Sequence, residues 1–119
     1  MVEYNNMQYV FHLPKEYSFE KVGIKGKTFG TKLLSDRVEF TIIETEKGHE
    51  TKIIEKECIF SYFILDGEGS FEIGGKIEKC QKGDLVFIPN NTVFKYTGKM
   101  KMLLVSTPWW FPEQEETLD

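Results

Sequence analysis

Few residues of the chain are of the kinds that usually carry out chemistry. Its two histidines are His12 and His49, and His49 is followed within ten residues by Glu55, Glu57 and Cys58. Imidazole, carboxylate and thiolate groups are ligands for divalent transition metals. Adjacent residues of a strand point to opposite faces, and Glu55 and Glu57 share the face opposite to Lys56, so we expect both glutamates on the outer surface. One histidine with two surface glutamates would form only a weak metal site.

Short strand-like segments separated by turn residues must position these groups. The segment 37–45 alternates apolar and polar residues, which is typical of a half-buried strand. Asp66-Gly67 and Gly74-Gly75 are hairpin signals. Further strands are expected at 7–13, 49–57, 59–66, 69–74, 76–80, 84–88, 92–97 and 100–106. Turn signals that recur about every eight to twelve residues predict an all-β sandwich or barrel.

Two segments marked by glycine and proline resemble the sequence motifs of the cupin family. Gly83 and Pro89 stand in register with the glycine and proline of the second cupin motif, and Gly48 and Gly67 frame the first. The resemblance covers about half of the chain. It implies the fold of that family, a single-domain double-stranded β-helix, or jelly-roll barrel.

The positions at which the family holds a metal ion carry other residues here. The two histidines of the first motif fall on Ile54 and Lys56, its glutamate falls on Phe60, and the histidine of the second motif falls on Phe94. Isoleucine and phenylalanine offer no lone pair, and a protonated lysine repels a cation. We therefore expect a cupin barrel with neither a metal nor another cofactor.

The motif register also implies which side chains point into the barrel, and strand alternation extends the set. The expected ligand-binding residues are Ile54, Lys56, Phe60, Tyr62, Phe94 and Tyr96. An aromatic pocket with one ammonium group favours a ring-shaped ligand that carries an anion, such as a sugar acid. In the alternative, Phe60 and Phe94 fill the barrel and Lys56 reaches its mouth.

Three functions follow from these observations. The first is a metal-free barrel that binds a small organic ligand, namely a sugar, a sugar acid or a similar anion. The second is a metal-independent sugar isomerase or epimerase, for which Lys56 with a depressed pKa is a candidate catalytic base. The third is a metal-dependent cupin enzyme with displaced ligands around His49.

Composition limits the partners and the location. The chain has 119 residues and a formal net charge of −4 at pH 7, which indicates one globular domain without a basic surface for nucleic acid. No apolar run reaches the length of a membrane span, and the first residues do not resemble a secretion signal. We therefore expect a cytoplasmic protein in which Cys58 and Cys80 are reduced.

Sequence patterns divide this domain 1–119 into stretches. We expect a loose N-terminus at 1–6, strands and loops at 7–35, and the barrel at 37–107, with its motif regions at 48–67 and 83–98. An aromatic and then acidic tail follows at 108–119. Trp109, Trp110 and Phe111 either cap the barrel or cover a second subunit. The resemblance implies a homodimer as the alternative to a monomer, and a small-molecule ligand as the other partner.

Overall fold

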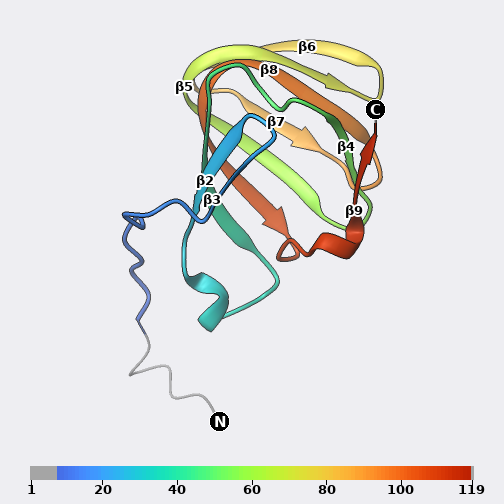
Figure 1. Cartoon of the computed structure of the whole chain (residues 1–119). Coiled ribbons are helices and arrows are strands. Elements are labelled where there is room, and N and C mark those ends of the chain that lie inside the picture. The colour runs from blue at the N-terminus through green and yellow to red at the C-terminus, as the bar shows by residue number, and fades with distance from the viewer. Residues whose placement is uncertain (1–7, 119) are drawn as a thin grey trace.

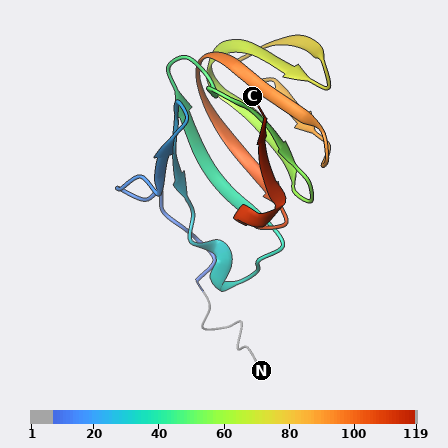
Figure 2. The same cartoon turned by 45° about the vertical axis from the view of Figure 1, so that its right-hand side comes forward.

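A computed structural model describes residues 8–118 as a strongly curled sheet (Figures 1 and 2). Its strands are β1 (Phe19–Lys21), β2 (Ile24–Thr28), β3 (Glu39–Thr45), β4 (Lys52–Glu55), β5 (Ile59–Ile73), β6 (Lys76–Gln81), β7 (Leu85–Ile88), β8 (Val93–Thr107) and β9 (Glu115–Leu118). Two short 3-10 turns, η2 (Thr31–Leu33) and η3 (Pro112–Gln114), are the only helical segments within 8–118. In this part of the chain no helix is long and apolar enough to span a membrane.

Two long strands organise the sheet. β5 and β8 pair antiparallel over most of their length. On its other edge β8 pairs with β4 through its first residues and with β3 through its later ones. The free edge of β5 pairs with β7 and then β6 in the same way. Each long strand therefore carries two short partners in succession and has to curl, which closes the sheet around an interior.

A bulge, and not a hairpin, lies at Asp66-Gly67. The predicted turn is wrong, because β5 continues through it and the register with β8 shifts between Ile64 and Asp66. Gly67 has φ +87°, and a Cβ there would lie 2.1 Å from the Lys99 carbonyl oxygen. A bulge bends its strand, and glycine allows that bend where two backbones approach closely. The predicted segments 92–97 and 100–106 are likewise one strand, β8. The hairpin at Gly74-Gly75 is confirmed between β5 and β6.

The N-terminal segment differs from the expectation. Residues 8–13 form no strand and are largely exposed, and Met7 lies outside the described residues, as does the stretch 1–6 expected to be loose. A strand needs a partner for its backbone groups. The edge of the sheet next to β2 is taken by β1 instead.

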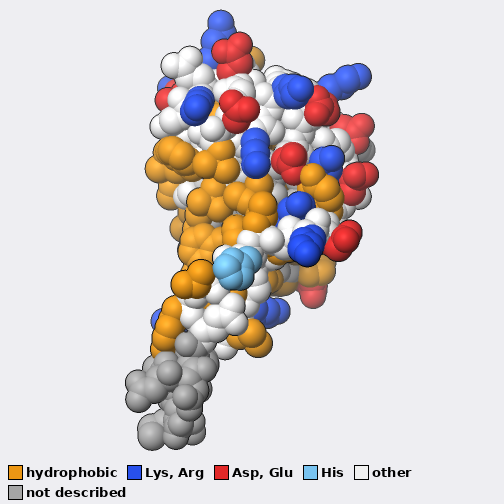
Figure 3. Space-filling view, turned by 90° about the vertical axis from the view of Figure 1, so that its left-hand side faces the viewer, with side chains coloured by type: hydrophobic (Ala, Val, Ile, Leu, Met, Phe, Trp, Pro, Cys, Tyr) orange, Lys and Arg blue, Asp and Glu red, His pale blue; other side chains and the backbone are white. Residues whose placement is uncertain are grey.

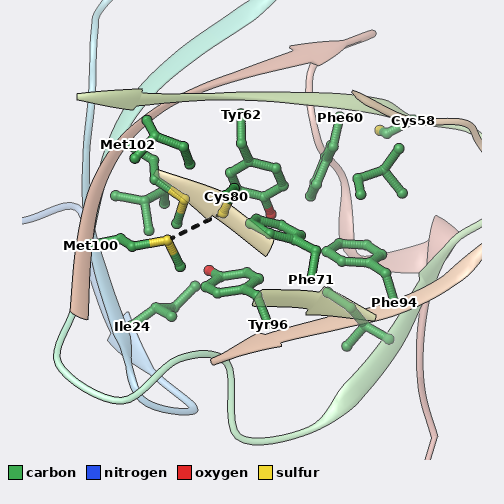
Figure 4. Close-up of a cluster of buried hydrophobic side chains, with 14 residues drawn as sticks. Ile24, Cys58, Phe60, Tyr62, Phe71, Cys80, Phe94, Tyr96, Met100 and Met102 are labelled. Carbon is green, nitrogen blue, oxygen red and sulfur yellow. Dashed lines mark hydrogen bonds between the residues drawn. The ribbon is translucent and has the colours of Figure 1, made fainter. Parts of the chain in front are cut away.

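Aromatic side chains fill much of the interior (Figure 4). Phe71 stacks on Tyr96 with ring centroids 4.8 Å apart, and Tyr62 lies edge-on to both Phe94 and Tyr96. Such pairs add to the free energy already gained by burying the rings. Met100 and Met102 continue the core beyond them. This part of the barrel is solid, which agrees in part with the alternative in which Phe60 and Phe94 fill the interior.

The outer surface also carries apolar residues. Figure 3 shows hydrophobic side chains gathered on the face above the N-terminal segment. An apolar groove on the outside of the sheet is lined by Phe11, Phe29, Thr31, Phe40, Ile42, Leu65 and Leu103. An apolar surface of this kind does not test whether the chain pairs with a second copy, so the homodimer stays a prediction.

The acidic tail is part of the sheet. Residues Glu115–Leu118 form β9, which pairs antiparallel with β4 at the end of the chain (Figure 1). Leading to it, Trp109 donates its backbone N–H to the Asp36 carbonyl oxygen at 2.9 Å. The Trp110 N–H donates to Glu39 Oε1, also at 2.9 Å. The C-terminal residues therefore close one side of the barrel.

Candidate functional site

A cavity remains beside the aromatic core, between β1–β3, β5 and the C-terminal segment. Its volume is about 120 Å³, equivalent to about four molecules of liquid water. Its lining mixes apolar and ionisable side chains: Phe19, Lys21, Ile24, Thr28, Glu39, Thr41, Ile43, His49, Ile53, Phe60, Tyr62, Leu104, Trp110 and Glu115. Lys21 is exposed and stands at its mouth. A ligand larger than this cavity would extend through that mouth.

A larger open crevice of about 760 Å³ lies on the outside. Charged side chains dominate its lining, among them Glu44 of β3, Glu46 just after it, and Lys99 and Lys101 of β8. Charges there remain in water, where interactions with a ligand are weak. The enclosed cavity is the stronger candidate, because its ionisable groups converge from four strands and the segment between β3 and β4, and those other than Lys21 are buried or half-buried.

His49 is held between β3 and β4. Gly48 adopts φ +113° and packs against Tyr96 and Thr97 of β8, and the His49 N–H donates to the Tyr96 carbonyl oxygen at 3.0 Å. The His49 Nδ1 lies 2.8 Å from the Thr51 carbonyl oxygen. A carbonyl only accepts, so Nδ1 carries the proton and Nε2 keeps its lone pair. Burial lowers the pKa of His49, which favours the neutral imidazole needed in a base.

Two tyrosines adjoin this imidazole. The Tyr96 ring lies 5.8 Å from His49 and 5.5 Å from Tyr62, measured between centroids. Burial raises the pKa of both phenols, so both hydroxyls stay protonated and can donate. The Tyr96 hydroxyl is buried without a hydrogen-bond partner among residues 8–118. A buried polar atom of this kind marks a place where a ligand or water can be bound.

Two glutamates complete the site. Glu55 of β4 is 1% exposed, and its Oε1 accepts hydrogen bonds from Trp110 Nε1 and Gln114 Nε2. Burial, followed by the neighbouring Glu115 carboxyl, raises the pKa of Glu55 to about 8. Glu39 is half-buried at the same wall, and burial raises its pKa too. The neutral imidazole of His49 therefore shares the cavity with the protonated phenol of Tyr62, and the Glu55 carboxyl lies behind the cavity wall.

Trp110 links the mouth to the buried carboxyl. The Lys21 Nζ lies 4.6 Å from the centre of the Trp110 ring, in a cation–π contact. The same indole donates to Glu55. Trp110 lines the cavity, as the prediction that the tail aromatics cap the barrel requires.

Four of the expected ligand-binding side chains point inward. Phe60, Tyr62, Phe94 and Tyr96 are all buried in the interior. Phe60 and Tyr62 line the cavity, whereas Phe94 and Tyr96 lie in the core behind it. Their part in binding a ligand stays a prediction.

The predicted orientation of Ile54 and Lys56 is wrong. In β4 the buried positions are Ile53 and Glu55, and Lys56 is exposed with its Nζ 3.1 Å from Glu116 Oε2. The segment 46–51 is an irregular turn region, so strand alternation cannot be counted from Gly48. The expectation that Glu55 lies on the outer surface fails for the same reason.

The metal-binding group predicted around His49 is split, because Glu57 is exposed while His49, Glu55 and Cys58 are buried. Within 8–118 no three His, Cys, Asp or Glu side chains are arranged to hold a metal ion.

Sequence reasoning missed His49 as a candidate base, and it missed Glu115. Nothing local marks Glu115, since its partner in the sheet, Glu55, lies sixty residues earlier in the chain.

No protein-family model matches the sequence, and no curated protein matches it. Solved structures do resemble the fold. Pac13, described as a unique nucleoside dehydratase, aligns with TM-score 0.85 and 23% identity over 94% of this chain and 92% of that one. KdgF from Halomonas aligns with TM-score 0.69 and 13% identity, over 80% and 87% of the two chains. An RmlC-like cupin from Shewanella frigidimarina aligns with TM-score 0.65 and 16% identity, over 82% and 86%.

Three further structures of the Streptomyces Pac13 contain uridine and carry single substitutions. One replaces a histidine by glutamine and aligns with TM-score 0.86 and 22% identity, over 95% and 92% of the two chains. The other two each replace a tyrosine by phenylalanine. At these identities the likeness establishes the fold, and the predicted cupin barrel is confirmed: the chain has the cupin fold.

Proposed function

We propose that the barrel binds a nucleoside, or a ligand of similar shape, and removes water from its sugar by acid–base catalysis with His49 as the base. The observation that carries this proposal is the buried cluster of His49, Tyr62 and Tyr96, with the imidazole neutral and its Nε2 unprotonated. It replaces Lys56, which is exposed and paired on the surface, as the candidate base.

The spacing of these three residues supports the proposal. In the uridine-containing Pac13 structures, the substituted histidine precedes the first substituted tyrosine by 13 residues, and that tyrosine precedes the second by 34. The same intervals separate His49 from Tyr62 and Tyr62 from Tyr96. A histidine and two tyrosines therefore recur with the same intervals in two chains that share a fold.

The geometry suits an elimination. Removing water requires a base for a proton on carbon and an acid for the departing hydroxyl on the next carbon. His49 Nε2 supplies the lone pair, and the hydroxyl of Tyr62, which lines the cavity with Tyr96 packed behind it, can orient the sugar. Phe19, Phe60 and Trp110 offer aromatic faces for a planar ring, and Lys21 at the mouth can meet a carbonyl or an anion.

A second candidate is a binding barrel that performs no reaction, with a sugar or sugar acid as its ligand. The aromatic wall and the Lys21 ammonium favour it, and both would also serve an isomerase that returns the proton His49 has taken. Turnover distinguishes these cases: loss of water indicates a dehydratase, a rearranged sugar indicates an isomerase, and unaltered bound ligand indicates a binding protein.

The test is an incubation with nucleosides, including ones that carry a carbonyl in the sugar, because a carbonyl acidifies the neighbouring C–H. Mass spectrometry detects the loss of one water. We expect His49→Gln to lower the rate by at least about 100-fold. The matched control is His12→Gln, since His12 is exposed and does not line the cavity. Failure of every nucleoside to bind, or full activity in His49→Gln, would refute the proposal.

A further inference from the structure

Glu55 and Glu115 face each other across neighbouring strands. They are direct partners in the antiparallel ladder of β4 and β9, and their carboxyl groups lie within hydrogen-bonding reach. Two ionised carboxylates directly opposite each other in a buried place repel strongly. A pair of this kind is stable when one proton lies between the two groups.

The hydrogen bonds around Glu55 assign the position of that proton. Its Oε1 already accepts from Trp110 Nε1, at 3.0 Å, and from Gln114 Nε2. Its Oε2 is buried and has no hydrogen-bond partner among the described residues while both glutamates are ionised. When Oε2 is protonated, it can donate a hydrogen bond to the Glu115 carboxylate. This gives the buried oxygen a partner and removes the repulsion between two negative charges.

Other titratable groups face the pair from each neighbouring element. Burial lowers the pKa of His49, between β3 and β4, and the Glu115 charge opposes this shift. Burial raises the pKa of Cys58, ahead of β5, and of Tyr62 on β5, and the Glu55 charge adds to both shifts. From β3, Glu39 reaches the pair through the Trp110 backbone, and from β1 the Lys21 ammonium lies over the Trp110 ring.

The pair is connected to the cavity through Glu115. Glu115 is half-buried and lines the cavity together with His49, whereas Glu55 lies behind it. Trp110 and Gln114, which donate to Glu55, and Glu115, which is its carboxyl partner, all lie within the six residues that start at Trp110. The C-terminal segment thus builds one complete wall of the site.

We propose that Glu55 and Glu115 share a single proton and that this pair is the general acid of the reaction, with Glu115 facing the departing hydroxyl and Glu55 positioning and holding the proton. The assignment rests on the proposed dehydration and adds to it the group that protonates the leaving oxygen.

The step balances as follows. His49 Nε2 takes a proton from carbon, the C–H electron pair forms the C=C bond, and the C–O bond breaks. The leaving oxygen takes the shared proton and departs as water. His49 is then protonated and the carboxyl pair carries two charges. Transfer of the imidazolium proton to the pair through solvent restores the starting state.

The shared proton can be tested without a substrate. In protein labelled with ¹³C at the glutamate carboxyls, NMR titration of the wild type should show one group that titrates near pH 8. We expect this transition to be absent from Glu55→Gln, shifted to lower pH in Glu115→Gln and retained in Glu116→Gln. Glu116 is the matched control, being exposed on the same strand and paired with Lys56. A wild-type spectrum in which all glutamates ionise below about pH 6 would overturn the proposal.

The acid role is tested with a nucleoside that the wild type dehydrates, in D₂O. Exchange of the C–H proton needs only the base, whereas loss of water needs both base and acid. We expect Glu115→Gln to keep the exchange while its elimination falls by at least about 100-fold, and Glu55→Gln to lose the alkaline limb of the rate profile. Glu116→Gln should keep both reactions.

Equal rates of elimination in Glu115→Gln and the wild type would overturn the acid role and leave His49 as the base. If no nucleoside is dehydrated by the wild type, the proposed function fails and the acid role fails with it, and the NMR titration still decides whether the proton is shared. Circular dichroism of each variant separates these effects from misfolding. The amide of Gln at position 55 can still accept at one atom and donate at the other, so we expect that variant to fold.

Discussion

Single residues in this barrel acquire their chemistry from where the backbone places them. The His49 imidazole is neutral because one ring nitrogen donates to the Thr51 carbonyl and burial disfavours the imidazolium. Glu55 can hold a proton because it is buried against a second carboxyl. Lys56, one position further along, has an ordinary surface ion pair with Glu116. Chemical type alone would rank Lys56 above Glu55, and the structure reverses that order.

Two lysines give a prediction at this scale. Lys56→Met should leave uridine affinity unchanged and alter the free energy of unfolding by less than about 1 kcal/mol, because an exposed ion pair contributes little. Lys21→Met should weaken uridine binding several-fold, since Lys21 lines the cavity and contacts Trp110. Isothermal titration calorimetry and urea denaturation measure both quantities. Equal loss of affinity in the two variants would argue against the assigned cavity.

At the scale of elements, the bulge in β5 gives the sheet its curl. Gly67 combines positive φ with close approach to the Lys99 backbone, so an added methyl group has no space. Gly67→Ala should lower the free energy of unfolding by about 2 kcal/mol or more. Gly30→Ala is the control, since Gly30 has negative φ and a Cβ there would meet nothing within 4 Å. Urea denaturation compares the two, and similar midpoints would mean that the bulge can relax.

The pairing of β4 with β9 predicts how stability depends on pH. The pKa of Glu55 is raised from about 4.5 to about 8 in the folded protein, so the folded state binds more protons than the unfolded chain between these values. The contribution of this group is therefore fully present below about pH 4.5 and is lost as the pH rises through about 8. Thermal unfolding across this range should show a falling midpoint in the wild type.

Glu55→Gln should remove most of that slope, because an amide does not titrate. Glu116→Gln, on the outer face of the same ladder, should keep it. An unchanged slope in Glu55→Gln would mean that other groups bind the proton.

On the scale of the whole molecule, the sequence predicts the barrel far better than it predicts the site. Gly74-Gly75 turns where expected, because a tight turn is decided by local backbone freedom. Asp66-Gly67 has the same local signature and forms a bulge, because pairing with β8 continues past it. Such pairing is non-local and leaves no mark in the sequence around the glycine.

The site depends on two features of the same non-local kind. The irregular segment 46–51 changes which face of β4 is buried, so that Glu55 and not Lys56 lies inside. The acidic C-terminal stretch joins the sheet beside β4 and brings Glu115 into the cavity. A buried charge is ordinarily costly, and the proposed shared proton would remove that cost.

The most direct test of the central claim is an NMR titration of ¹⁵N-histidine-labelled protein with uridine. We expect the His49 ring to show the neutral tautomer with the proton on Nδ1, and its Nε2 resonance to shift on adding uridine. The exposed His12 serves as an internal control and should not respond. A His49 ring that is protonated at neutral pH, or one as unaffected by uridine as His12, would contradict the assignment of this cavity as a nucleoside site with a histidine base.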